Sequence, residues 1–351
     1  MKILILTQSL DRNDKVLGFF HAWVDAFAKE CESVTVIALR VGEYELPKNV
    51  RVLSLGKENG VSRAKYLFRF FRYIIEERKN YDTVFVHMNP IYIILGGIFW
   101  KMMKKKIALW YTHRHVDLKL RLAVVGADII FSSSSESFRL KSSKVNFMGH
   151  GIDVNFWASI TPKENKKVFT VVQVGRITPI KHCELLIEAA SRFTAHNERE
   201  SQVFFLGEPA VASDDEYFVE LRQSVEEKGL GRVVTFAGGA TPSEVRDQYR
   251  RAHVTINMLP TGGMDKVVLE SLAAGVPVIT SNQTWKPLFG EYAKDFVLPE
   301  LNPKSGEQLA SALLSISQHD LSLNMRAELK QKVMREFSHE ALVRKIVTQL
   351  S

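Results

Sequence analysis

The sequence predicts an α/β protein built from two doubly wound domains, and three observations predict it. Strand-like runs of aliphatic and β-branched residues alternate with helical patterns along the chain. This alternation occurs in two successive series, separated by a polar stretch at 161–167 that is typical of a domain linker. At 351 residues, the chain also exceeds the size at which a single hydrophobic core usually stops growing.

The first series predicts a domain over residues 1–160. Strands are expected at 2–6, 33–39, 50–55, 83–87 and 106–112. Helices are expected at 18–30, 63–79 and 90–103. Because the expected strands are almost continuously apolar, both faces of their sheet should be covered by helices, which is typical of parallel sheets.

The second series predicts a similar domain over residues 161–332. Strands are expected at 168–174, 202–206, 233–236, 254–258 and 276–280. Helices are expected at 182–193, 215–228, 243–251 and 266–274.

Bulk properties narrow the class of protein. With 46% hydrophobic and 25% charged residues, the composition is that of a globular protein and excludes a disordered chain. The net charge of +8 favours an anionic partner, and charge alone leaves nucleic acid, a phosphate-bearing small molecule and an acidic membrane surface open. Cys31 and Cys183 lie far apart without metal or redox spacing, which indicates structural thiols in a reducing compartment. The longest apolar run, 91–100, is shorter than the roughly 20 residues of a membrane-spanning helix.

The loop that follows the expected strand 168–174 is a candidate phosphate site. Ligands of open parallel sheets bind beyond the carboxyl ends of the strands, so these loops are where chemistry is expected. Gly175 permits close backbone approach, while Arg176 and Lys181 supply positive charge beside a helix amino terminus. The alternative is a solvated basic loop.

The segment 261–280 is a second candidate. Asp265 can cap a helix that begins at Lys266, and the amides of the first helical turn favour an anion. Apolar residues surround most of this helix, so a carboxylate at Glu270 needs a partner. A ribose diol would satisfy it, whereas the alternative is a glutamate exposed to water at the helix rim.

Several segments in order resemble the GT-B glycosyltransferases of family 4. The matching segments are VGRITPIKHCELLIEAA, FLGEP, VVTFAGGATPSEVRDQYRRAHVTINMLP and KVVLESLAAGVPVIT. In addition, 146–157 resembles the family's entry to the domain junction, and 337–350 resembles the terminal helix that returns to the first domain, so a C-terminal helix is expected within 333–351. The resemblance implies a GT-B fold with two Rossmann-like domains facing across a cleft, and transfer of a hexose from a UDP- or GDP-linked sugar with retention of configuration.

The resemblance also assigns roles to individual residues. It implies that Arg176 and Lys181 hold the donor diphosphate and stabilise it as it leaves, and that Glu270 holds the ribose. The family has an earlier glutamate that contacts the transferred sugar, and this chain departs from the family there because it has Gly262. Asp265 could substitute for that carboxylate or only cap the helix. The complete predicted donor-binding set is Gly18, Gly175, Arg176, Lys181, Gly263, Asp265, Lys266, Val267 and Glu270.

His113 is the remaining predicted catalytic residue, beside Arg176 and Lys181. It follows the expected strand 106–112, where the family places a histidine near the anomeric carbon. His113, His115 and Asp117 could suggest a metal, but no further ligand set or Asp-x-Asp motif appears. We therefore expect neither a metal nor another cofactor, and expect the cationic side chains and helix amides to supply the counter-charge.

Basic and apolar residues alternate at 62–79, which indicates an amphipathic helix. Such a helix can pack on its own sheet, or it can meet anionic lipid through Arg63, Lys65, Arg69 and Arg72, aided by the basic segment 100–106. The second interpretation predicts a cytoplasmic enzyme, peripheral on the inner membrane face, that glycosylates a glycan or lipid-linked acceptor in polysaccharide biosynthesis. The rivals are a catalytically impaired nucleotide-sugar-binding relative, suggested by Gly262, and a GT-B epimerase or hydrolase. No recognised nucleic-acid-binding motif appears.

Overall fold

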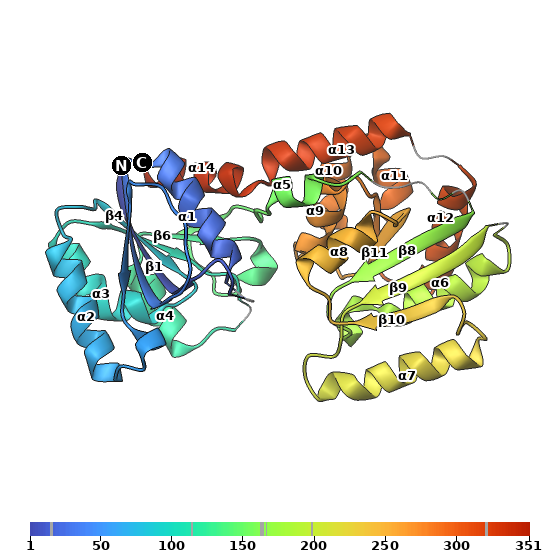
Figure 1. Ribbon diagram of the computed structural model, residues 1–351, viewed down its shortest axis with the longest axis horizontal. Helices are drawn as coiled ribbons and strands as arrows, with labels where there is room; N and C mark the ends of the chain where they lie inside the picture. The colour runs from blue at the N-terminus through green and yellow to red at the C-terminus, as the bar shows by residue number, and fades with distance from the viewer. Residues whose placement is uncertain (15–16, 114, 162–164, 166, 198, 320–321) are drawn as a thin grey trace. The chain divides into compact units, whose positions relative to one another are not determined.

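The computed structural model describes residues 1–14, 17–113, 115–161, 165, 167–197, 199–319 and 322–351 (Figure 1). It contains two compact units: unit 1 consists of Met1–Asp153 with Ser338–Ser351, and unit 2 consists of Val154–Phe337. Residues 162–164 and 166 of the expected linker lie outside the described residues. Each unit is an α/β structure around one parallel sheet, so the predicted fold class is confirmed.

Unit 1 has a seven-stranded sheet in the order β3-β2-β1-β4-β5-β6-β7, in which every neighbouring pair is parallel. Its strands are β1 Lys2–Leu10, β2 Ser33–Val41, β3 Val50–Ser54, β4 Thr83–His87, β5 Lys106–Trp110, β6 Ile129–Ser132 and β7 Val145–Phe147. In register, Ile3 of β1 lies beside Val34 on one side and Thr83 on the other. The chain order therefore reverses around β1, as in doubly wound sheets.

Successive residues of β1 point to opposite faces of this sheet and contact different helices. Ile3 and Ile5 belong to a core with α1 Phe19–Glu30 and α14 His339–Leu350. Leu4 and Leu6 belong to a core with α2 Arg63–Glu76, α3 Ile91–Met102 and α4 Leu118–Gly126. Unit 1 is thus a three-layer structure whose chain termini lie close together, as Figure 1 shows.

Unit 2 has a five-stranded parallel sheet in the order β10-β9-β8-β11-β12. Its strands are β8 Val168–Val174, β9 Glu200–Leu206, β10 Val234–Gly238, β11 Val254–Asn257 and β12 Val278–Thr280. Its α-helices are α5 Val154–Ala158, α6 Cys183–Thr194, α7 Ser213–Glu227, α8 Pro242–Tyr249, α9 Lys266–Ala273, α10 Lys286–Phe289, α11 Ala293–Phe296, α12 Ser305–Gln318 and α13 Leu323–Glu336. Short 3₁₀ turns include η3 Pro179–Lys181 and η4 Gln283–Trp285.

Some elements differ from the sequence-based expectation. The strand expected at 276–280 begins only at Val278, because the amide of Val276 still closes the end of α9 on the carbonyl of Ser271, at 3.0 Å. The C-terminal helix matches the segment expected at 337–350 but does not fill 333–351: α13 ends at Glu336, and the side chain of Ser338 caps α14 by accepting from the Ala341 amide at 2.9 Å. In the described ranges, no helix is both long and apolar enough to cross a bilayer.

Candidate functional site

The loops after β8 and β9 meet backbone to backbone in unit 2. Gly175, directly after β8, has a φ of 125°, and its amide donates to the carbonyl of Leu206 at 2.9 Å. A Cβ atom on Gly207, directly after β9, would lie 1.9 Å from the carbonyl oxygen of Gly175, so only glycine fits there. The amide of Ile177 donates to the carbonyl of Glu208 at 3.1 Å and holds the rest of the loop. Arg176 is exposed between these anchored positions.

A cation and a carboxylate from distant parts of the sequence pair at the end of this loop. Lys181, the last residue of η3, forms an ion pair with Asp265, and the two side chains are only 15% and 18% exposed. The side-chain amide of Asn257, the last residue of β11, donates to the same Asp265 carboxylate oxygen at 3.0 Å. Burial alone would raise the pKa of Asp265, but the Lys181 charge and the surrounding donors outweigh it and lower the pKa. Asp265 is therefore held ionised.

Asp265 also caps α9. Its other carboxylate oxygen accepts from the amide of Val267 at 3.4 Å, which confirms the predicted cap. Its side chain is therefore already engaged by a lysine, an asparagine and a backbone amide. The inner side of α9 is buried, and the helix packs against α5 and α13.

Glu270 lies one turn into α9 and is half-buried. Burial raises the pKa of its carboxyl to about 7; Lys266 and Lys181 act to lower that pKa, and Asp265 acts to raise it further. Burial lowers the pKa of Lys266, against the opposing influence of Glu270 and Asp265. Glu270 is thus partly shielded from water, and Lys181, Lys266, Asp265 and Glu270 influence one another at the start of α9.

The segment before α9 is held by the loop after β12. Gly262 has a φ of 119°, and its amide donates to the hydroxyl of Thr284 at 3.1 Å and to the side-chain oxygen of Asn282 at 3.4 Å. The side-chain amide of Asn282 donates to the carbonyl of Gly263. The residue that replaces the family's glutamate is therefore a glycine in a backbone conformation that other residues rarely adopt. The sequence analysis missed Asn257, Asn282 and Thr284, although Asn257 ends β11 and the other two follow β12, which was the signal available.

Residues 158–333 match the family described as "Glycosyl transferases group 1". The chain belongs to this family. The prediction of a glycosyltransferase family is therefore confirmed, and every predicted unit 2 site residue lies within the matched segment of this group 1 glycosyl transferase.

Curated relatives match a part of the chain. The chain is 29% identical over 122 residues to the D-inositol 3-phosphate glycosyltransferase of Gordonia bronchialis. The aligned residues make up 34% of this chain and 26% of the relative. The same protein of Rhodococcus opacus is 29% identical over 126 residues, 35% of this chain and 27% of the relative. These matches span only about a quarter of the relatives' length.

Solved structures match almost the whole chain. Anabaena Alr3699/HepE, solved in complex with UDP, has a TM-score of 0.71 at 16% identity and covers 100% of this chain and 99% of its own. A glycosyltransferase from Rickettsia africae has a TM-score of 0.72 at 15% identity, covering 99% and 98%. These similarities confirm the GT-B fold.

The predicted residues of unit 1 lie apart from this cluster in the sequence and belong to a different unit. His113 is exposed just after β5, and its Nδ1 accepts from the amide of His115 at 3.1 Å. A neutral His113 then carries its proton on Nε2. Asp117 caps α4 by accepting from the Leu120 amide at 2.8 Å. Among the described residues, no group of three or more side chains forms a metal site.

Gly18 is explained by local packing. It precedes α1, and a Cβ atom there would lie 2.6 Å from the carbonyl oxygen of Asp14. The carboxylate of Asp14 pairs with Arg40 and accepts from the amide of Leu17 at 3.0 Å. The predicted contact of Gly18 with a donor stays a prediction.

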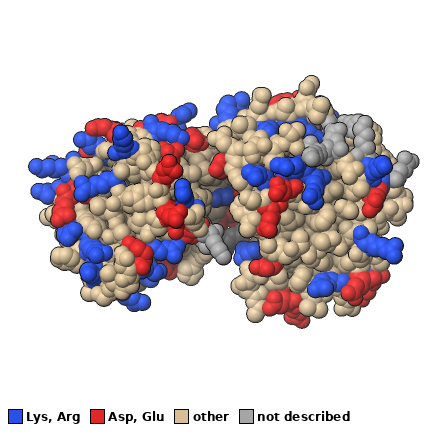
Figure 2. Space-filling view, viewed as in Figure 1, with Lys and Arg blue, Asp and Glu red and all other residues tan. Residues whose placement is uncertain are grey.

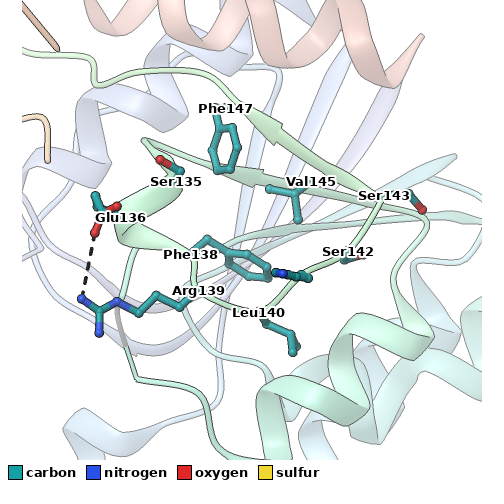
Figure 3. A pocket seen from close by; sticks show the side chains of 10 residues that line it. Ser135, Glu136, Phe138, Arg139, Leu140, Ser142, Ser143, Val145 and Phe147 are labelled. Atoms are coloured by element: carbon teal, nitrogen blue, oxygen red, sulfur yellow. Dashed lines mark ion pairs between the residues drawn. The ribbon is translucent and has the colours of Figure 1, made fainter. Parts of the chain in front are cut away.

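Two hollows in the described structure lie away from these side chains. In unit 1, a hollow of about 810 Å³ lies beside the edge strand β7 (Figure 3), where Phe138 and Phe147 border it and Arg139 pairs with Glu136 at 3.9 Å. In unit 2, a hollow of about 570 Å³ lies beside α7 and β10. Neither hollow is lined by a predicted site residue.

Proposed function

We propose that this group 1 glycosyl transferase moves a sugar from a nucleoside diphosphate sugar to a glycan or lipid-linked acceptor. The observation that carries the proposal is the meeting of Lys181, the amino terminus of α9 and Glu270 in unit 2. A cation beside a helix amino terminus suits a diphosphate, and a half-buried carboxylate one turn away suits a sugar diol. The complex of the similar Anabaena protein contains UDP, which favours a UDP-linked donor here.

The diphosphate would be bound by Arg176, Lys181 and the amide end of α9. An ammonium has three N–H donors, so Lys181 can keep its bond to Asp265 and still donate to a phosphate oxygen. Arg176 is exposed on the anchored loop and adds a second positive charge. Stabilising the charge that develops on the leaving diphosphate is usually the largest catalytic contribution of a site. In this proposal, these groups supply the counter-charge without a metal or cofactor.

Glu270 would bind the ribose. Both ribose hydroxyls can donate to one ionised carboxylate, which favours the charged form and lowers the pKa that burial has raised. The amides of Gly263 and of the start of α9 would contact the donor, since Gly262 offers no carboxylate. His113, with its proton on Nε2, would donate to the transferred sugar and assist a reaction that retains configuration.

The reaction is proposed to take place in the cytoplasm, at the inner face of the membrane, where a lipid-linked acceptor of polysaccharide biosynthesis is accessible. Gly262 favours one rival, a relative that binds nucleotide sugars without turnover. An epimerase or hydrolase is the other rival, and it would convert the donor with no acceptor present.

A two-stage measurement tests the proposal. A thermal-shift screen of nucleoside diphosphates and their sugar conjugates should show stabilisation by UDP and by a UDP-sugar, and a smaller effect from uridine. Incubation of the selected donor with short glycans and lipid-linked sugars should then release UDP only with an acceptor, and NMR should show a retained anomeric configuration. Stabilisation without UDP release would support the non-catalytic relative, and release without acceptor the hydrolase. No stabilisation by any nucleotide would overturn the assignment.

A further inference from the structure

The outer sides of α2, α3 and α4, which together cover one face of the unit 1 sheet (Figure 1), are rich in exposed apolar side chains. Of the fifteen large exposed hydrophobic side chains in the described parts of the chain, nine lie on these three helices. They are Leu67, Phe68, Ile75, Ile98, Phe99, Met102, Leu118, Leu122 and Val125. We name these residues the three-helix surface.

The three helices form one continuous layer. The rings of Phe71 on α2 and Phe99 on α3 lie 5.3 Å apart between centroids. On the other side of α3, a Cβ atom on Gly126 of α4 would lie 2.9 Å from Cγ2 of Ile93, so α3 and α4 approach closely. The exposed apolar side chains therefore lie on neighbouring helices.

The core of unit 1 does not account for this patch. Each helix already buries its inner side, with Phe70 and Ile74 on α2, Trp100 on α3 and Leu120 on α4. Met102 and Val125, in contrast, are each 77% exposed. A helix that packs with one side and exposes apolar residues on the other indicates a second contact. The inner side of α2 packs on its own sheet, as one sequence-based interpretation expects, and the contact with anionic lipid in the other interpretation stays a prediction.

The charges around the patch are almost all positive. The exposed ionisable residues of the three helices are six cations and one carboxylate: Arg63, Lys65, Arg72, Lys101, Lys119, Arg121 and Glu76. Arg72 pairs with Glu76 at 3.4 Å and Lys101 pairs with Asp128. For the other four cations, the described residues provide no ion pair. Figure 2 shows Lys and Arg side chains, with some Asp and Glu, among uncharged ones over the part of unit 1 where Figure 1 places α2 and α3.

We propose that the three-helix surface and its cations dock unit 1 onto an anionic lipid bilayer. Exposed apolar side chains that enter the headgroup region, bordered by cations that attract anionic lipids, are the recognised physical basis of interfacial binding. Positive charge selects an anionic bilayer over an apolar partner protein, which would leave these cations unpaired. The inference rests on the proposed function only for its purpose, which is to hold the enzyme at lipid-linked acceptors.

Co-sedimentation of the full-length protein with vesicles tests this. Pure phosphatidylcholine vesicles are compared with vesicles that also contain phosphatidylglycerol, at low and high salt. One variant removes apolar contacts (Ile98→Ser, Met102→Ser, Val125→Ser), a second reverses charge (Lys65→Glu, Lys119→Glu, Arg121→Glu), and a control changes equally exposed residues of unit 2 (Val219→Ser, Leu323→Ser). Circular dichroism and UDP titration of each variant check folding and donor binding separately.

Native protein and control should sediment with the anionic vesicles, and less at high salt. Reversal of each charge removes a positive charge and adds a negative one, so it should weaken binding to anionic vesicles about 30-fold at low salt. The apolar variant should weaken binding at both salt concentrations. Equal failure of the native protein on both vesicle types would overturn the proposal. The proposal would also be overturned if the unit 2 control lost as much vesicle binding as the apolar variant. Self-association of a native protein that does not bind vesicles, abolished in the apolar variant, would overturn it as well. Because UDP titration needs no lipid, failure of docking with normal UDP binding would leave the transferase proposal standing.

Discussion

Replacing Glu270 with Gln should stabilise unit 2, and increasingly so as the pH rises. Burial raises the pKa of this carboxyl from 4.5 to about 7 in the folded protein. Below pH 4.5 it is protonated in both the folded and the unfolded state, so it adds no pH dependence. Between the two pKa values, the unfolded chain ionises first, and the folded state loses stability as the pH rises. Above pH 7, the cost reaches a plateau.

The magnitude follows from the size of the pKa shift. At about 1.4 kcal/mol per pKa unit, a rise from 4.5 to about 7 costs about 3 kcal/mol at pH 8. At pH 5, the cost is only about 1 kcal/mol, because this pH lies just above the pKa of the unfolded chain and most of the loss accumulates between pH 5 and pH 7. Glutamine cannot ionise, so Glu270→Gln should gain about 2–3 kcal/mol relative to the native protein between pH 5 and pH 8.

Urea unfolding of the two proteins at both pH values, monitored by a probe in unit 2, measures this difference. Glu226→Gln removes an exposed carboxylate from the same unit and serves as a control. It should show a difference that hardly changes with pH. A stability gap between Glu270→Gln and the native protein that stays constant from pH 5 to pH 8 would refute the reasoning that the Glu270 carboxylate is strained by burial.

Three further substitutions test other parts of the site. Lys181→Met leaves the mostly buried Asp265 without its cation and should lower the free energy of unfolding of unit 2 by about 2–3 kcal/mol. The double variant with Asp265→Asn should recover part of this loss. If the effects of the two substitutions in this double-mutant cycle simply add, the pairing is contradicted. Gly262→Ala should lower the free energy of unfolding by about 1–3 kcal/mol because Gly262 has a positive φ. Gly263→Ala, with open space around its Cβ atom, should lower it by less than about 0.5 kcal/mol. Equal unfolding midpoints of the two variants would argue against a backbone requirement at Gly262. His113→Ala should leave stability and UDP affinity unchanged because the side chain is exposed, and lower turnover about 100-fold; normal turnover would remove His113 from the mechanism.

Many regular elements were predictable because their periodicity is local, although the helices α4, α12 and α13 were not predicted. The strands of the second series and the cap at Asp265 follow from apolar runs and from one short motif, and the structure has them. The short elements β6, β7, α5, α10 and α11 were not predicted, because three to five residues carry little periodic signal.

The contacts within the site were less predictable. The ion pair of Lys181 with Asp265 joins residues 84 positions apart, and no local pattern indicates it. The anchoring of Gly262 by Asn282 and Thr284 likewise depends on which strand ends are neighbours in the sheet, since β11 and β12 pair only in the folded unit. The start of the strand after α9 also escaped prediction: the amide of Val276 donates to the carbonyl of Ser271 at the end of α9, and β12 begins only at Val278.

Calorimetric titration with UDP at pH 8, on native protein and on Glu270→Ala, tests the central claim most directly. If unit 2 holds the ribose through this carboxylate, the substitution should weaken UDP binding by about 1–3 kcal/mol, while Glu226→Ala leaves it unchanged. Identical UDP affinity of the native protein and Glu270→Ala would place the nucleotide elsewhere and contradict the site described above.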